Sequence, residues 1–335
     1  LPICTGLTRS KIFRSESRDE PFLPSIMRIG KNLLVIYLLL TFIAIGLILF
    51  TGLSLWESVN LALATISTGG FTLHSGGIAS YNSLYLELLL IPIMIVGALP
   101  FKLYYLVIEN RRFSLFGDVQ VKLFFIILAI AAVVLVHDLM FFTNLEPADA
   151  VHQGVFMAVS ALTTTGYQIT GLPAWADVTI LFFALIVFIG GAAGSAAGGI
   201  KLNRVGFAAR ALFWWFQRLF VSGKVLIPFR IDGHIIPRAT AEFETAKNML
   251  VIVLSVVIVF VASLIIIQFG QGSASITEIL FSVTSAFSNC GINTGFVSPE
   301  MPVVAKWVTI LTMWIGRLEV IPVLMLMIAL FKGED

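Results

Sequence analysis

The sequence predicts an all-α polytopic membrane protein built from repeated helical units. Three observations support this: a composition that is 58% hydrophobic and 12% charged, a mean hydropathy of +0.99 over 335 residues, and a glycine turn that recurs three times. A soluble domain carries about a quarter charged residues, so half that fraction cannot cover a globule in water. The composition argues against a soluble enzyme, a nucleic-acid binder and a disordered chain. The two cysteines, Cys4 and Cys290, argue against a disulfide framework and a cysteine metal site.

Apolar runs of spanning length form the first and last element of each unit. A membrane-spanning helix needs about 20 apolar residues. The sequence predicts such runs at 33–50, 84–101, 123–142, 178–189, 249–269 and 303–331, the fourth being short. Glu87 and Pro92 interrupt the second run, and Arg317 and Glu319 lie within the last. Residues 202–220 predict an amphipathic helix or the cytoplasmic end of a helix.

Three shorter apolar helices are predicted between these runs, at 55–66, 148–162 and 275–287, and their length suits re-entrant helices. Each leads into a turn of small or polar residues, then a glycine and a bulky apolar residue. The turns, which align without gaps, are Ser67-Thr68-Gly69-Gly70-Phe71, Thr163-Thr164-Thr165-Gly166-Tyr167 and Ser288-Asn289-Cys290-Gly291-Ile292. One such turn is weak evidence, but three in the same helical context predict an internal repeat.

The charge distribution predicts the orientation of the chain. Nineteen of the 21 Lys and Arg residues precede the first span, lie between the repeated units or end the chain; Lys306 and Arg317 are the exceptions. By the positive-inside rule these segments and both termini are cytoplasmic, and the glycine turns open outward. Against the single basic residue Lys306, the predicted outer side carries eight acidic residues: Glu57, Glu87, Asp138, Glu146, Asp149, Asp177, Glu278 and Glu300. An acidic mouth concentrates cations, although outer loops also become acidic simply because basic residues are kept inside.

The glycine turns predict an ion-binding ring. Irregular backbone at membrane depth is allowed only where it is buried in protein or lines water. Turns that converge on one axis would present backbone carbonyls, which can replace the hydration shell of a monovalent cation. The predicted carbonyl donors are Thr68, Gly69, Gly70, Thr164, Thr165, Gly166, Asn289, Cys290 and Gly291. The alternative, loops between ordinary spans with glycine as a helix C-cap, is favoured for one turn but not for three.

Together these motifs resemble the Trk/Ktr/HKT superfamily of potassium transporters. The resemblance rests on residues 64–71, 163–167, 190–201 and 316–319, and extends from about residue 8 to 331. It implies a TrkH-like pore subunit, in which four M1–pore helix–filter–M2 units surround a pseudo-fourfold pore. This sequence shows three units, which resemble the second, third and fourth. Since the chain also starts at Leu1 rather than Met, we expect it to be N-terminally incomplete.

The resemblance divides the chain into five segments. They are a cytoplasmic N-terminal segment 1–30, a second-unit-like 31–112, a third-unit-like 113–220 with an intramembrane glycine-rich loop 190–200, a cytoplasmic loop 221–245, and a fourth-unit-like 246–332. The sequence departs from the superfamily after the last turn. Many bacterial members have a Pro-Gly pair there, whereas this chain has Thr294-Gly295.

A gate is predicted on the inner side of the turns. Glycine-rich sequence in 190–201 breaks a helix and allows motion, while close helix packing through small residues is an equal alternative on residue grounds. A charge within a span, such as Arg317, is costly and usually faces a cavity or a partner. The resemblance implies a pore-obstructing loop and an electrostatic barrier or loop anchor; the residues also allow Arg317 to pair with Glu319 or backbone carbonyls. The predicted gate residues are Gly190, Gly191, Gly194, Ser195, Gly198, Gly199 and Arg317.

The resemblance implies channel-like potassium uptake at the plasma membrane, with potassium as substrate and no cofactor or enzyme activity. It also implies a homodimer and a cytosolic nucleotide-binding regulatory subunit, similar to TrkA or KtrA, on the basic inner loops. The four histidines share no metal-ligand spacing. A sodium- or proton-coupled symporter using Asp138, Glu87 or Glu319, and a non-conducting fragment, remain alternatives. Sodium in place of potassium also stays open, because the first filter unit, where selectivity differs among plant relatives, is absent.

Overall fold

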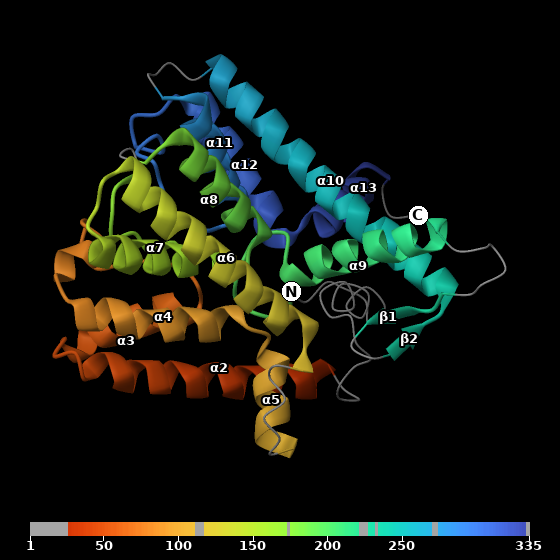
Figure 1. The fold of residues 1–335 in the computed structure, drawn as a ribbon, viewed down its shortest axis with the longest axis horizontal. Helices are drawn as coiled ribbons and strands as arrows, with labels where there is room; N and C mark the ends of the chain where they lie inside the picture. The colour runs from red at the N-terminus through yellow and green to blue at the C-terminus, as the bar shows by residue number, and fades with distance from the viewer. Residues whose placement is uncertain are drawn as a thin grey trace.

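The computed structural model describes residues 26–110, 117–172, 175–220, 227–231, 234–269 and 274–332. Most of the predicted segment 1–30, the end of the second-unit-like segment and residues 221–226 lie outside these ranges. The described elements are α2 (Ile26–Leu49), α3 (Leu55–Ile66), η1 (Ile78–Tyr81), α4 (Leu84–Ala98), α5 (Phe101–Asn110), α6 (Val119–Phe142), α7 (Pro147–Leu162), α8 (Asp177–Ile189), α9 (Leu202–Leu219), β1 (Phe229–Ile231), β2 (His234–Ile236), α10 (Arg238–Phe269), α11 (Ile276–Phe287), α12 (Val303–Leu318) and α13 (Val320–Lys332) (Figure 1).

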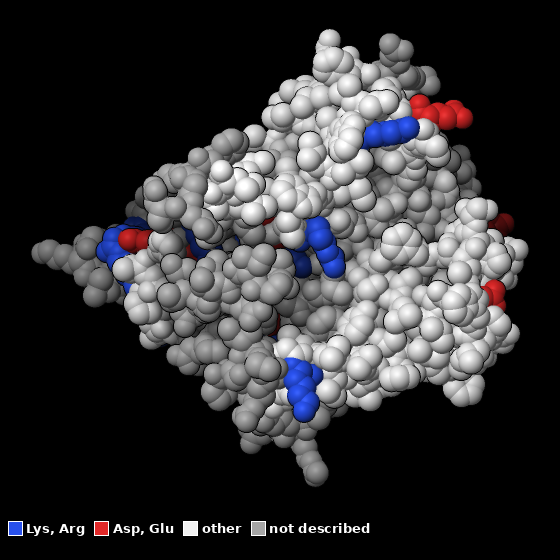
Figure 2. All heavy atoms as spheres, turned by 180° about the vertical axis from the view of Figure 1, so that it is seen from behind, with Lys and Arg blue, Asp and Glu red and all other residues white. Residues whose placement is uncertain are grey.

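Three helices of the described chain, α2, α6 and α10, are long and apolar enough to cross a membrane. The number rises to five if the bent pairs α4–α5 and α12–α13 each count as one span. Their outward faces carry large apolar side chains, among them Phe42 at 68%, Val133 at 69% and Phe260 at 59% exposure. Figure 2 shows one face of the molecule, on which charged side chains are few and the described surface is mainly uncharged. Such a surface suits contact with lipid rather than water.

Each short helix packs between the two longer helices of its own unit. Helix α3 contacts α2 and α4, α7 contacts α6 and α8, and α11 contacts α10 and α12. The units are joined by α4 against α7 and by α8 against α11. The last helix of one unit therefore contacts the short helix of the next, the arrangement expected of a rotational repeat.

The first and third short helices begin with the same local structure. The Ser54 and Ser275 hydroxyls each accept a hydrogen bond from the backbone N–H of the third residue of their helix. The carboxylates of Glu57 and Glu278 in turn accept one from the backbone N–H of the serine. This reciprocal capping box satisfies backbone groups that a helix start leaves unpaired. The middle helix α7 instead begins at Pro147, whose missing N–H costs nothing at the first helical position.

Two of the predicted spans meet a sharp bend, 84–101 at its end and 303–331 near its middle. The 84–101 run stays helical through Pro92 and breaks at Leu99, where α4 and α5 meet at 92°. Leu99 is extended (φ −89°, ψ 156°) because Pro100 disfavours helical backbone in the residue before it. The 303–331 run breaks at Glu319, with 105° between α12 and α13. Glu319 has φ 62°, outside the helical region, and an ion pair with Arg204 holds its side chain.

Helix α9 buries one stripe against a two-stranded antiparallel sheet and the start of α10. Phe207, Trp214, Phe229 and Ala241 form a small cluster separate from the main core. The indole of Trp214 donates to the carbonyl of Ile227 at 2.9 Å. The other faces of α9 are exposed and carry large apolar side chains, among them Leu212, Phe213 and Trp215, beside the polar Arg210 and Gln217.

Candidate functional site

The three glycine turns have the same backbone conformation. Thr68, Thr164 and Asn289, which occupy equivalent positions, have φ values of 50°, 52° and 52°. At the glycine position φ is 66° in Gly70, and the values in the other two turns are 89° and 87°. The turns begin where α3, α7 and α11 end, at Ile66, Leu162 and Phe287.

The same hydrogen bonds also fasten each turn to its helix. The backbone N–H of Gly69, Thr165 and Cys290 donates to the carbonyl five residues earlier, at 2.7, 3.0 and 3.0 Å. A serine hydroxyl of α7 and one of α11 brace the turns further, from Ser160 to the Tyr167 carbonyl and from Ser285 to the Ile292 carbonyl, at 2.7 and 2.8 Å. Alanine occupies the matching position of α3. The gap-free alignment of the three turns thus has a structural counterpart.

The turns meet each other through their glycines. A Cβ added to Gly70 would lie 2.0 Å from the carbonyl oxygen of Thr165, and one added to Gly166 would lie 1.8 Å from that of Cys290. Only glycine fits where backbone approaches so closely. Gly70, Gly166 and Gly291 line one cavity of about 280 Å³. The nine predicted carbonyl donors therefore lie in three turns that the fold brings together.

The third turn has a different neighbourhood. No atom of the described residues lies within 4 Å of a Cβ placed on Gly291, although its φ of 87° matches that of Gly166. The close approach of one turn to the next therefore occurs twice in the described chain and not on the outer flank of Gly291.

The predicted gate residues, apart from Arg317, lie in an irregular loop between α8 and α9. Gly190, Gly194 and Gly199 have positive φ, which ends α8 and turns the chain back. Gly198 lies against the second and third turns: its N–H donates to the Thr164 hydroxyl at 2.6 Å, and an added Cβ would lie 1.8 Å from the Ser288 carbonyl. The loop thus contacts the helix-proximal ends of the turns, whereas the cavity is lined by their glycine ends.

The loop is also bonded to the bend between α4 and α5. Ala192 N–H donates to the Ala98 carbonyl at 3.1 Å, Ala196 N–H to Gly97 at 3.2 Å, and Phe101 N–H to the Gly194 carbonyl at 3.0 Å. The Gln120 side chain of α6 accepts from Ala193 N–H at 2.9 Å. These bonds satisfy backbone groups that an intramembrane loop would otherwise leave unpaired.

Arg317 contacts this loop from the last turn of α12. Its guanidinium donates to the carbonyl of Ala196 at 3.5 Å. The alternative that Arg317 pairs with Glu319 is wrong, because Glu319 pairs with Arg204 at the start of α9. Both members of that pair are largely buried. The pair ties the chain that follows the loop to the bend between α12 and α13.

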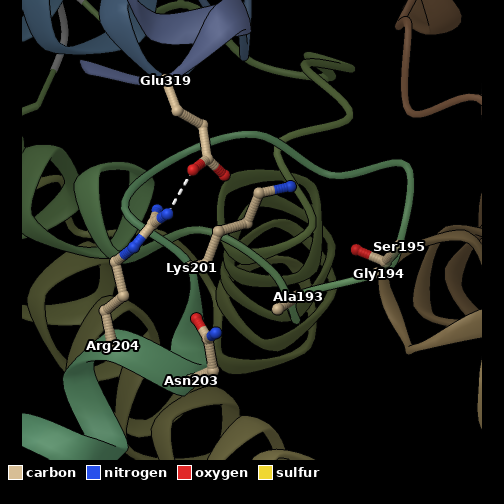
Figure 3. A pocket seen from close by; sticks show the side chains of 7 residues that line it. All are labelled: Ala193, Gly194, Ser195, Lys201, Asn203, Arg204 and Glu319. Carbon is tan, nitrogen blue, oxygen red and sulfur yellow. Dashed lines mark hydrogen bonds and ion pairs between the residues drawn. The ribbon is translucent and has the colours of Figure 1, made fainter. Parts of the chain in front are cut away.

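A small cavity of about 50 Å³ lies beside this ion pair (Figure 3). In the close-up, Glu319 points toward the Arg204 guanidinium, and Lys201 lies beside them, with Ala193, Gly194 and Ser195 of the loop on the far side. No local sequence pattern predicts the Arg204–Glu319 pair, because the two residues are 115 positions apart.

Several acidic residues of the outer side, among them Glu57, Glu87 and Asp138, lie against polar neighbours. Hydrogen bonds from the Ser54 side chain and backbone hold the pKa of Glu57 below its ordinary value. Glu87 of α4 lies 2.6 Å from His152 of α7, and Asp138 accepts from the Thr179 hydroxyl at 3.0 Å. None of these carboxylates is among the described residues that line the cavity at the glycine turns. No group of three or more potential metal-binding side chains occurs in the described ranges.

The sequence model of one family matches nearly the whole chain: TrkH, described as a cation transport protein, covers residues 8–333. The chain belongs to the TrkH family of cation transport proteins. The resemblance to the Trk superfamily and the helical membrane fold class are therefore confirmed, as is the expectation of a transport protein rather than an enzyme.

Several relatives and solved structures match this TrkH-family chain. A cation transporter of Methanocaldococcus jannaschii is 28% identical over 329 residues, covering 98% of this chain and 65% of the relative. The Trk system potassium uptake protein TrkH of Escherichia coli K12 is 26% identical, covering 100% and 69%. The crystal structure of the potassium transporter TrkH from Vibrio parahaemolyticus superposes with a TM-score of 0.80 at 24% identity, covering 92% and 66%. The chain thus spans about two thirds of the length of these proteins.

Proposed function

We propose that the complete protein is the pore-forming subunit of a potassium uptake system in the plasma membrane. The glycine turns act as its selectivity filter, with the carbonyls of the nine predicted donors replacing water around the ion. One observation supports this most directly: equivalent glycines of neighbouring turns face the carbonyls of the next turn, and all three glycines share one cavity. The printed names of the E. coli and V. parahaemolyticus relatives favour potassium as the ion.

The loop between α8 and α9 serves as the gate of this pore. It lies against the second and third turns through Gly198, and Arg317 holds it through the Ala196 carbonyl. Opening requires these contacts to break, so that the Arg317 charge no longer stands beside the ion path. An Arg at membrane depth is expensive unless it has such a partner.

The positive-inside rule supports cytoplasmic termini and inter-unit loops. Ions then enter at the glycine ends of the turns and leave past the loop, and a negative-inside potential favours this direction by about 2.3 kcal/mol per charge per 100 mV. The basic inner segments are the proposed docking surface for a cytosolic nucleotide-binding regulatory subunit of the TrkA or KtrA kind, and the complete protein is proposed to be a homodimer.

Flux through reconstituted protein tests the proposal. The complete protein from the gene is placed in liposomes loaded with potassium, and uptake of labelled rubidium is followed with no proton or sodium gradient. We expect uptake driven by the electrical gradient alone, inhibited by external potassium at lower concentrations than by sodium.

Absence of uptake would refute a conducting pore. Uptake that requires a proton or sodium gradient would instead support the coupled symporter. Each carboxylate suggested for coupling has a polar neighbour: Glu87 lies beside His152, Asp138 accepts a hydrogen bond from Thr179 and Glu319 pairs with Arg204. These contacts give each carboxylate a structural role that needs no coupling ion.

A further inference from the structure

The middle glycine turn is fastened to both of its neighbours by two consecutive side chains. On one side, the hydroxyls of Tyr167 and Thr65, the latter on α3, lie 2.9 Å apart. On the other side, the side-chain amide of Gln168 reaches Asn293, which follows the third turn. Gln168 stands two positions after Gly166 and, with Tyr167, lines the cavity that the three glycines share.

The contact between Gln168 and Asn293 is a two-point clamp. Gln168 Nε2 donates to the Asn293 carbonyl at 3.0 Å, and the Asn293 N–H donates to Gln168 Oε1 at 3.1 Å. A side-chain amide carries one acceptor and a donor group in fixed geometry, so it can replace a peptide unit in this pairing. Two bonds to one residue fix both distance and orientation between the second and third turns.

The clamp holds a braced segment rather than a free loop. The Asn293 side chain accepts from the N–H of Gly295 at 3.0 Å and of Val297 at 3.2 Å, and donates to the Val297 carbonyl at 2.7 Å. The main-chain groups that Gln168 binds are therefore held in place by the Asn293 side chain. Of the Gln168 and Asn293 side chains, only that of Gln168 forms hydrogen bonds between the second and third turns.

The three turns differ in whether the side chain two positions after the glycine forms hydrogen bonds to another turn. The gap-free alignment places Thr72, Gln168 and Asn293 at the same step after the filter glycine. The Thr72 hydroxyl donates to the His74 carbonyl of its own loop at 2.9 Å. Of these three side chains, only that of Gln168 bonds across to another turn.

We propose that Gln168 is a positioning residue that determines ion specificity by fixing the spacing of the second and third turns. This inference rests on the proposed filter function. A smaller cation such as sodium is coordinated well only if the carbonyls move inward, and a filter that keeps its spacing resists that movement. The clamp opposes the movement of the Gly166 turn toward the Cys290 turn without touching the ion.

The test compares ion preference with transport rate in the complete protein in liposomes. Gln168→Leu removes both bonds while keeping a side chain of similar size. Gln168→Glu keeps the acceptor for the Asn293 N–H and loses the donor to the Asn293 carbonyl. Gln217→Leu, on the exposed face of α9, is the matched control for the same chemical change away from the filter.

We expect Gln168→Leu to lower the preference for rubidium over sodium at least about fivefold, since one net hydrogen bond is worth about that factor in an equilibrium constant. Gln168→Glu is expected to fall between wild type and Gln168→Leu, and Gln217→Leu to match wild type. Reduced rubidium uptake with an unchanged ion preference would show a merely structural role and overturn the inference.

The outcomes separate this inference from the proposed function. Wild-type protein that conducts no cation refutes the proposed function itself, whereas selective wild type with an equally selective Gln168→Leu refutes only the clamp. If Gln168→Leu does not reach the membrane, the ion preference of Gln168→Glu is measured instead. Wild-type selectivity in Gln168→Glu then overturns the inference.

Discussion

Replacement of Gly166 by serine tests the carbonyl ring at its tightest point. An added Cβ would lie 1.8 Å from the Cys290 carbonyl oxygen, so that oxygen must retreat by at least about 1.2 Å to restore a 3.0 Å separation. The φ of 89° adds strain, because left-handed backbone costs an L-residue about 1–2 kcal/mol. The Cys290 carbonyl is then displaced from the ion.

A contact of a polar group with a full charge is worth about 1.5–3 kcal/mol, so loss of one carbonyl ligand predicts a decrease of about ten- to a hundredfold in potassium over sodium preference. Gly70→Ser is expected to act in the same way through the Thr165 carbonyl, which lies 2.0 Å from its added Cβ. Gly46→Ser on α2 is the control, since no described atom lies within 4 Å of its Cβ.

The assay is competition of sodium and potassium for labelled rubidium uptake in liposomes or in cells that depend on this protein. Wild-type uptake and an unchanged sodium block in Gly166→Ser and Gly70→Ser would refute the argument that these turns form the ring around the ion.

Three further predictions concern the loop. Thr164→Val removes the hydroxyl that Gly198 N–H donates to, and should raise rubidium flux several-fold; Thr68→Val is the matched control, because the Thr68 hydroxyl donates within its own turn to the Ser67 carbonyl. Equal flux in both variants would contradict a link between turn and loop. Arg317→Ala should raise flux by freeing the loop at Ala196 and removing a positive charge. Deletion of residues 194–198 should raise flux further, and wild-type flux in both this deletion and Arg317→Ala would exclude the gate assignment. Each is measured as initial rubidium uptake per amount of protein in the membrane.

The predicted short helices agree closely with the structure. Their predicted bounds of 55–66, 148–162 and 275–287 compare with Leu55–Ile66, Pro147–Leu162 and Ile276–Phe287. These helices are set by local signals: an apolar run of limited length, a polar residue at the start and a turn of small residues at the end. The repeat of the turns was visible for the same reason, because equal local sequence gives equal backbone.

The predicted long spans agree less closely with the structure where a bend depends on residues distant in the sequence. Hydropathy alone made 303–331 one span, but Glu319 leaves the helix where it meets Arg204, 115 positions earlier. Pro92 is the predicted interruption of 84–101, but the helix continues through Pro92 and ends at Ala98, just before Pro100. At this end the carbonyls of Gly97 and Ala98 accept hydrogen bonds from the loop between α8 and α9. A hydropathy pattern reports the surroundings of a residue averaged over a helix, not the partner of one side chain.

The sequence by itself determined that this chain is a helical membrane protein with three equivalent glycine turns, because composition, run length and repeated local motifs need no knowledge of distant contacts. Only the tertiary structure decided which turn faces which carbonyl, that Gln168 clamps Asn293 and that Arg204 rather than Arg317 pairs with Glu319. Those contacts join residues 95 to 125 positions apart in the sequence. They depend on how the three helical units pack against one another, and no local segment of the sequence determines that packing.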